Sequence, residues 1–184
     1  NVIFTSIEVA MKEYPELVKK YFGKIVKNNE NILNAKNLTV EYDTEDFNKK
    51  AIHNDENAVK IILQNIIETS IKLTDVGTIF IKVTHPDMDV VKKSGAKIGK
   101  ASSSLSYVQI SISDTGMGLA EAELDGIFEP YTQLDKTHKK TIVRSITLGT
   151  AYTMLKRMGG AVWINSEVMK GSTFNIILPI EKAN

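Results

Sequence analysis

One strand and the turn after it carry most of the information in this chain: Tyr107-Val-Gln-Ile-Ser-Ile-Ser113, then Asp114-Thr-Gly-Met-Gly118. Apolar and polar side chains alternate along residues 107–113, which predicts a strand with one buried face. A carboxylate at a strand end can accept a hydrogen bond from a ligand amino group, and glycines let the backbone approach a ligand closely. The pattern Asp-x-Gly-x-Gly alone is more often an ordinary turn, so the surrounding segments decide whether it forms a site.

The other segments predict an α/β protein. Residues 56–73 form the clearest helix, because apolar residues recur there at helical spacing and give one buried face. Further helices are expected over residues 6–34, with a start or kink at Pro15, and over residues 148–158; further strands are expected over residues 38–42, 78–83, 161–166 and 172–178. This order predicts a two-layer α/β (α+β) sandwich, with a mixed, mostly antiparallel sheet and helices packed on one face.

The length of 184 residues fits one domain with a peripheral addition. We assign residues 37–184 to that domain and residues 1–36 to an N-terminal helical segment. This segment is either a linker, such as the tail of a dimerisation region, or a peripheral layer of the domain. Residues 85–106 are rich in Lys, Gly and Ser and are expected to form a long exposed hairpin insertion. Because the chain begins at Asn1 without Met, we expect it to be a piece of a longer protein.

The composition argues against several classes of function. Lys plus Arg total 23 against 22 for Asp plus Glu, so the net charge implies no bulk attraction to nucleic acid or to a membrane. No apolar run approaches the roughly 18 to 20 residues that cross a bilayer. The absence of cysteine removes disulfides, thiol catalysis and cysteine-based metal sites, and it fits a reducing compartment. We expect a cytoplasmic domain, whether or not its parent protein is anchored in a membrane.

Several motifs follow one another in a defined order. They are Asp55 before a helix that contains Gln64-Asn65 and Ile71-Lys72, Asp114-Thr-Gly-Met-Gly118, Ile127-Phe-Glu-Pro-Tyr131, Leu148-Gly149, Met158-Gly-Gly160 and Lys170-Gly-Ser-Thr-Phe174. In this order and spacing, residues from about 38 to 180 resemble the catalytic ATP-binding domain of sensor histidine kinases, within the gyrase, MutL and histidine kinase ATPase group. Each match is weak alone, and the ordered set is specific.

The resemblance implies an adenine site and a lid. Asp114 would accept a hydrogen bond from the adenine amino group, and Gly116 and Gly118 would form the first glycine box. Thr173 would help to hold adenine, often through water. Phe128 and Pro130 match the family's phenylalanine box, which would open an ATP lid over residues 127–147.

The phosphate side departs from the family pattern at two places. Asn65 matches the asparagine box and Lys72 the cation near the phosphates, but the second asparagine, which ligates Mg²⁺ in the family, is replaced by Thr69. Asn65 and Thr69 are therefore the candidate metal ligands. In the second glycine box, residues 145–150, only Gly149 remains, and its β-branched neighbours obstruct close approach of the backbone to phosphate. Three basic residues nearby, Lys139, Lys140 and Arg144, either offset some of the lost phosphate contacts or form a solvated lid surface.

Three functions are consistent with these motifs. The first is the ATP-binding half of a two-component histidine kinase, which passes the γ-phosphoryl group of Mg-ATP to a histidine on a separate dimerisation domain of the same parent chain and acts with a response regulator. The second is a non-catalytic pseudokinase module with weak or no ATP binding that acts by docking. The third is another ATPase of the superfamily, in which Glu68 would be the catalytic glutamate. None of them involves nucleic acid, and in the first no residue of this chain is the nucleophile.

Overall fold

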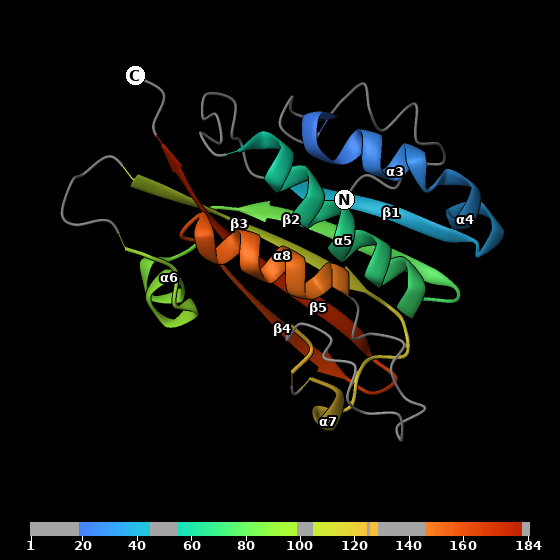
Figure 1. Cartoon of the computed structure of the whole chain (residues 1–184). Coiled ribbons are helices and arrows are strands. Elements are labelled where there is room, and N and C mark those ends of the chain that lie inside the picture. Colours follow the sequence, from blue (N-terminus) through green and yellow to red (C-terminus); the bar gives the residue numbers. More distant parts are fainter. Residues whose placement is uncertain (1–18, 45–54, 99–104, 125, 129–145, 182–184) are drawn as a thin grey trace.

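The computed structural model describes residues 19–44, 55–98, 105–124, 126–128 and 146–181. Its centre is a five-stranded sheet in the order β1-β2-β3-β5-β4 (Figure 1). The strands are β1 (Leu38–Thr44), β2 (Gly77–Thr84), β3 (Leu105–Asp114), β4 (Ala161–Glu167) and β5 (Gly171–Glu181). Only β1 and β2 pair in parallel, and every other pair is antiparallel. The predicted mixed, mostly antiparallel sheet is confirmed.

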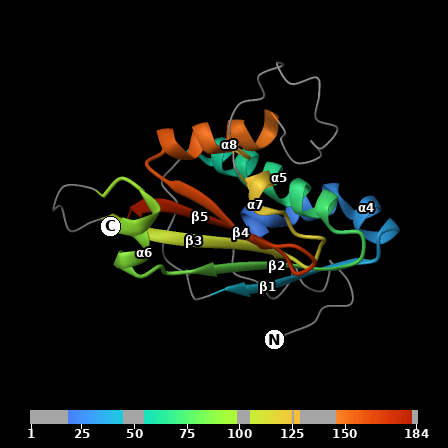
Figure 2. The same ribbon diagram turned by 90° about the horizontal axis from the view of Figure 1, so that it is seen from below.

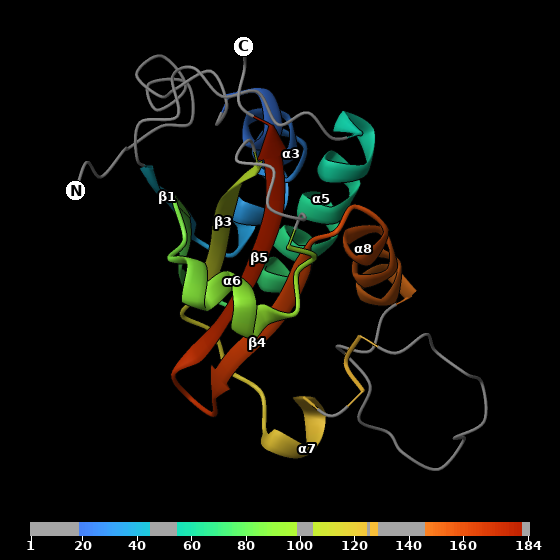
Figure 3. The ribbon, with the colours of Figure 1, turned by 90° about the vertical axis from the view of Figure 1, so that its left-hand side faces the viewer.

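Two long helices cover one face of this sheet. Helix α5 (Glu56–Leu73) connects the parallel strands β1 and β2, as a parallel pair requires. It has the predicted bounds and begins at Asp55, whose side chain accepts hydrogen bonds from the amides of Asn57 (3.0 Å) and Ala58 (3.2 Å). Helix α8 (Ile146–Arg157) packs beside α5 on the same face (Figure 3). No helix in the described part of the chain is both long and apolar enough to cross a membrane.

The sheet has one apolar and one polar face. Val108, Ile110 and Ile112 of β3 point toward the helices and lie in the main core. On the other face, Asn175 of β5 accepts hydrogen bonds from Gln109 (3.3 Å) and Ser111 (2.8 Å). The alternation that predicted the strand therefore separates the main core from the opposite face of the sheet, which is polar at these positions.

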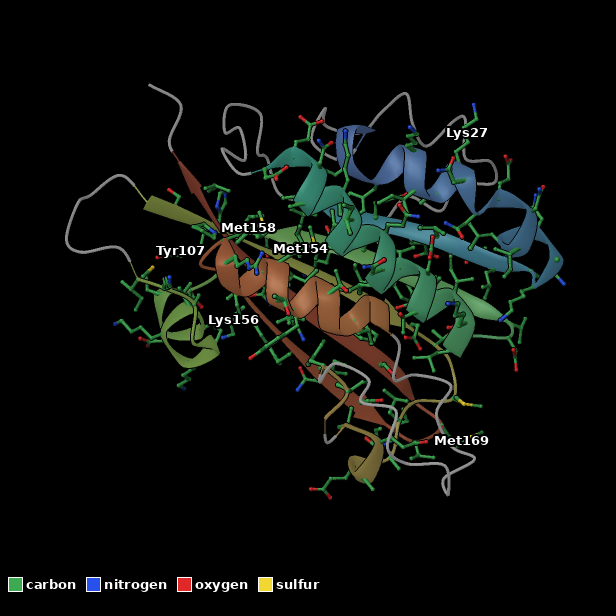
Figure 4. All side chains as sticks on the ribbon, in the orientation of Figure 1. Lys27, Tyr107, Met154, Lys156, Met158 and Met169 are labelled. Carbon is green, nitrogen blue, oxygen red and sulfur yellow. The ribbon has the colours of Figure 1, made fainter. Side chains whose placement is uncertain are left out.

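Residues 85–106 differ from the expected exposed hairpin insertion. They do connect two antiparallel neighbours, β2 and β3, but they contain a helix, α6 (Met88–Ser94). Its Val91 is fully buried and packs in a second, smaller apolar cluster with Tyr107 and Ile177, on the face opposite α5 and α8 (Figures 2 and 3). Tyr107 marks this end of the sheet, and Met169 in the β4–β5 turn marks the other end (Figure 4). The helix was not predicted because the segment has few apolar residues among many lysines, a composition typical of a surface loop.

The N-terminal segment is part of the domain wherever it is described. It consists of a π-helical turn η1 (Lys19–Gly23) and helices α3 (Lys24–Asn28) and α4 (Glu30–Ala35). Tyr21, Phe22, Ile25 and Val26 lie in the main core, and the Phe22 ring meets the Tyr42 ring edge-on at 6.2 Å. The helix breaks at Asn29, whose side-chain amide donates to the Ile25 carbonyl at 2.9 Å. Residues 19–36 thus form an additional layer of the domain, and residues 1–18 lie outside the described part.

Lys36 ties this layer to the end of α5. Its ammonium group donates to the main-chain carbonyls of Ile71 (2.9 Å) and Thr74 (3.0 Å) and lies 3.5 Å from the Asp75 carboxylate. The last carbonyls of a helix have no partner within the helix and carry a partial negative charge, so a cation there is stabilising. This contact fixes the C-terminal end of α5 relative to β1.

We expect Lys36→Met to lower the free energy of unfolding by about 1–2 kcal/mol, because two charge-assisted hydrogen bonds and the favourable interaction with the helix end are lost. Urea denaturation followed by circular dichroism measures this. Lys27→Met, at an exposed position of α3 (Figure 4), is the matched control and should change stability little. Equal stability of the two variants would contradict the anchoring role of Lys36.

Candidate functional site

Asp114 lies at the end of β3 and is only 4% exposed. Its Oδ1 atom accepts hydrogen bonds from the amides of Gly116 (3.0 Å) and Ser172 (3.3 Å). Its Oδ2 atom is buried and has no hydrogen-bond partner among the described residues. One carboxylate oxygen therefore holds the side chain in place, and the other is free to accept a hydrogen bond from a ligand.

Burial raises the pKa of the Asp114 carboxyl, because desolvation disfavours the charged form. The amides of Gly116 and Ser172 act in the opposite direction, as do the hydroxyls of Thr74 and Ser70 nearby, and desolvation outweighs them. A donor that reached Oδ2 would favour the ionised form and lower this pKa. The carboxyl is thus sensitive to whether a ligand is present.

Two hydroxyl side chains at the end of α5 accompany Asp114 in the core. Ser70 and Thr74 are both fully buried. The Thr74 hydroxyl donates to the Ser70 carbonyl at 2.8 Å, whereas the Ser70 hydroxyl has no hydrogen-bond partner in the described structure. No sequence motif points to either residue, because a single serine or threonine at the end of a helix gives no distinctive pattern.

Gly116 and Gly118 were expected to let the backbone approach a ligand, and the structure gives them a different role. A Cβ atom at Gly116 would collide with the carbonyl oxygen of Leu73, the last residue of α5. A Cβ atom at Gly118, where φ is +66°, would collide with the carbonyl oxygen of Glu167 in β4. The glycines allow the turn to fit between α5 and the β4–β5 hairpin, and so they position Asp114.

Thr173 is not brought to Asp114. In the β3–β5 register Asp114 lies opposite Ser172, and Thr173 lies opposite Ser113 on the other face of the sheet, 2.8 Å between the two hydroxyls. Ser172, 2% exposed, is the residue beside Asp114, and its hydroxyl lies 2.9 Å from that of Ser166. Strand alternation could have shown this, since Phe174 points into the core and residues two apart share a face.

The α5 residues predicted for the phosphate side differ in exposure. Asn65 is half-buried, Thr69 is 6% exposed and Lys72 is exposed. The Thr69 hydroxyl donates to the Asn65 carbonyl at 2.7 Å, so it is directed at its own helix. The described ranges contain no group of three or more His, Cys, Asp or Glu side chains that could hold a metal ion.

The start of the predicted lid rests on α8. The Phe128 ring stacks on the Tyr152 ring with centroids 5.6 Å apart, and the Lys156 ammonium lies 5.6 Å from the centre of the Tyr152 ring. Gly149 is buried in the first turn of α8, on the helix that packs against α5. Residues 129–145 of the predicted lid lie outside the described residues.

Comparisons with known proteins agree with this arrangement. The model of the family described as histidine kinase-, DNA gyrase B-, and HSP90-like ATPase matches residues 54–182. The autoinducer 2 sensor kinase/phosphatase LuxQ of Vibrio vulnificus is 31% identical over 133 residues, which are 71% of this chain and 14% of LuxQ. The aerobic respiration control sensor protein ArcB of Escherichia coli is 28% identical over 126 residues, 67% of this chain and 14% of ArcB. The chain therefore spans a small part of the length of these relatives.

Solved structures show the same fold. Full-length ShkA in complex with AMPPNP superposes with a TM-score of 0.68 at 21% identity, over 92% of this chain and 31% of ShkA. The catalytic domain of the histidine kinase ThkA superposes with a TM-score of 0.62 at 17% identity, over 85% of this chain and 88% of that domain's chain. The chain thus belongs to the histidine kinase-, DNA gyrase B- and HSP90-like ATPase family, as an ATP-binding catalytic domain of the sensor histidine kinase type.

Proposed function

We propose that this domain binds ATP as the catalytic domain of a two-component sensor histidine kinase. The observation that carries the proposal is the buried, unpartnered Oδ2 atom of Asp114 at the end of β3. Family membership supports it, as does the presence of an ATP analogue in the ShkA structure.

The Asp114 carboxylate fits adenine better than guanine. An ionised carboxylate only accepts hydrogen bonds, and adenine carries an exocyclic amino group that donates them. Guanine carries a carbonyl oxygen at the same ring position, which would face Oδ2 with no proton between the two oxygens. Because Oδ1 is held by the amides of Gly116 and Ser172, Oδ2 cannot turn away from a mismatched base without breaking those bonds.

The residues on the phosphate side of the site fit their ligands less well than Asp114 fits adenine. The side-chain oxygen of Asn65 is a ligand type that Mg²⁺ accepts, but Thr69 is buried and its hydroxyl is directed at the Asn65 carbonyl. The described residues therefore fit Mg²⁺ poorly, and we assign no step to the metal. Lys72, and Gly149 at the N-terminal end of α8, are the groups we assign to the phosphates, because a cation and a helix N-terminus both attract anions.

The proposed role in the parent protein is to position ATP for transfer. The γ-phosphoryl group would pass to a histidine on a dimerisation domain of the same parent chain and then to a response regulator. Transfer of this kind depends on positioning and charge neutralisation, so this domain needs no nucleophile of its own. We place this activity in the cytoplasm.

A second candidate function follows from the poor metal site. A pseudokinase module that keeps the fold and the adenine pocket would act by docking to a partner. Incubating the full-length parent protein with radiolabelled Mg-ATP separates the two functions. Label that remains on a histidine favours the kinase, and nucleotide binding without label favours the module.

Asp114→Asn should weaken ATP binding by about 10-fold or more, because a charge-assisted hydrogen bond to the base is lost and the amide presents a donor to the adenine amino group. Calorimetric titration with Mg-ATP measures the affinity. Asp43→Asn, at an exposed carboxylate on β1 that lies 3.4 Å from Lys82, is the matched control and should bind like the wild type. An unchanged affinity in Asp114→Asn would contradict the adenine site.

The same Asp114→Asn substitution should raise stability at neutral pH in the absence of nucleotide. The raised pKa of Asp114 means that its contribution to stability is present in acid and is lost as the pH rises through its folded-state pKa. An uncharged side chain does not incur that loss, so the gain should shrink toward zero in acid, where the wild-type carboxyl is protonated in both states. Urea denaturation at neutral and acidic pH tests this, and a gain that grew in acid would contradict it.

Thr173→Val should leave ATP affinity within about twofold of the wild type, because its hydroxyl faces Ser113 on the sheet face away from Asp114. The substitution keeps the shape of the side chain and removes only the hydroxyl. The same titration measures the affinity. A loss of ATP affinity as large as that caused by Asp114→Asn would show that Thr173 does contribute to adenine binding.

A further inference from the structure

We propose that Lys36 is a positioning residue for ATP binding, because it holds the last turn of α5 in the place from which Asp114 receives adenine. The proposal rests on ATP as the ligand and deepens that assignment. The N-terminal layer, residues 19–36, would thereby contribute to nucleotide affinity through α5 and not by direct contact. This role is additional to the contribution of Lys36 to stability.

The first argument is that the two long helices end differently. In α8, Gly159 has a φ of +77° and the Gly160 amide donates to the Leu155 carbonyl at 2.8 Å, so this helix caps itself. Helix α5 has no such glycine, and Thr74, the residue after its last turn, is extended with φ −115° and ψ 118°. Carbonyls at the end of α5 are instead bonded by donors from other parts of the chain.

Lys36 supplies such a cap from the N-terminal layer. Its ammonium group donates to the carbonyls of Ile71 and Thr74, and its side chain is only 25% exposed, so water replaces these bonds poorly when they are lost. The backbone of Lys36 is fixed as well, because this residue ends α4 and its amide donates to the Ile32 carbonyl at 3.0 Å. The position of the α5 end therefore depends on the position of α4.

The second argument is that the same turn of α5 supports the adenine site. The Met117 amide donates to the Leu73 carbonyl at 3.3 Å, and Gly116 lies so close to that carbonyl that the turn after β3 cannot shift toward the helix. Burial raises the pKa of the Asp114 carboxyl, and the Thr74 hydroxyl is among the groups that oppose this by favouring the ionised form. A displaced helix end would disturb both the position of the carboxylate and its ionisation.

The third argument is that the N-terminal layer is attached firmly enough to act on the helix. Phe22 is fully buried and Val26 is 2% exposed, and both lie in the main core together with Ile66 of α5. The layer thus meets α5 in two places, with η1 against the helix and Lys36 at its end. Coupling between two such sites is reciprocal, so ATP binding should in turn stabilise the position of Lys36.

The test compares two nucleotides on the wild type and on Lys36→Met. They are ATP and inosine triphosphate, which has a carbonyl oxygen in place of the adenine amino group and cannot donate to Asp114. Calorimetric titration, at a temperature at which circular dichroism shows both proteins folded, gives the ratio of the two affinities. The wild type should prefer ATP by about 10-fold or more. Lys36→Met should weaken ATP binding by about 5-fold and inosine triphosphate binding much less, so the ratio should fall.

Two further variants separate positioning from general stability. Tyr107→Phe removes a hydroxyl that donates to the Lys97 carbonyl at 3.0 Å, in the cluster that supports α6 (Figure 4), and should keep the wild-type ratio. The double variant Lys36→Met/Asp114→Asn should bind ATP about as weakly as Asp114→Asn alone, because both substitutions act on the same contact with the base.

If Lys36→Met does not fold, hydrogen exchange in the wild type decides. The amides of Lys36 and Asn37 donate to carbonyls within α4, and saturating ATP should slow their exchange, measured by nuclear magnetic resonance. The Val91 amide of α6 is the control and should exchange at the same rate with and without ATP. Unchanged exchange at Lys36 and Asn37 would overturn the coupling.

The outcomes distinguish this inference from the proposed function. If the wild type binds ATP and Asp114→Asn does not, while Lys36→Met equals the wild type, ATP binding stands and the role of Lys36 is overturned. The role is also overturned if Lys36→Met weakens both nucleotides by the same factor, if Tyr107→Phe lowers the ratio as much, or if the losses add in the double variant. If the wild type binds no ATP, or does not prefer it to inosine triphosphate, both proposals fail.

Discussion

The contact between the turn after β3 and the last turn of α5 determines the site. The Met117 amide donates to the Leu73 carbonyl, and Gly116 lies so close to that carbonyl that any side chain there would collide with it. This contact brings a carboxylate from the sheet and two hydroxyls from the helix into one buried space. Lys36 strengthens it from the other side by holding the final carbonyls of the same helix. The site therefore lies where the sheet meets the helical layer, and both layers place buried polar atoms there that need hydrogen-bond partners.

The fold could be predicted from sequence because its long elements have strong periodicity. Helix α5 is 18 residues long and amphipathic throughout, and its predicted and observed bounds coincide. Helix α6 is seven residues long, and its burial depends on Tyr107 and Ile177, which lie in distant parts of the sequence. A short helix that is stabilised by tertiary contacts leaves no periodic pattern of its own. For the same reason, the sequence alone did not decide whether the N-terminal segment is a linker or a part of the domain.

The sequence singled out some residues of the candidate site and not others. Asp114 was identified because a carboxylate after an alternating strand stands out. The motif pointed to Thr173, whereas the residue that lies beside Asp114 is its neighbour Ser172; because side chains alternate along a strand, the two lie on opposite faces of the sheet. Ser70 has no partner in the described structure, and a sequence gives no sign of an unsatisfied hydroxyl. Features that depend on the absence of a contact can be found only after all the contacts are known.

The polar face of the sheet has a consequence for how reliably the chain finds its register. Gln109, Ser111 and Ser113 occupy every second position of β3 and face away from the helices. A slip of β3 by one residue would turn these side chains into the apolar core and Asp114 out toward water. Such a slip would leave several polar groups unsatisfied at once, so misregistered forms are strongly disfavoured during folding. The polar side chains on the outer face of β3 thus favour the one register in which the Asp114 carboxylate points into the core.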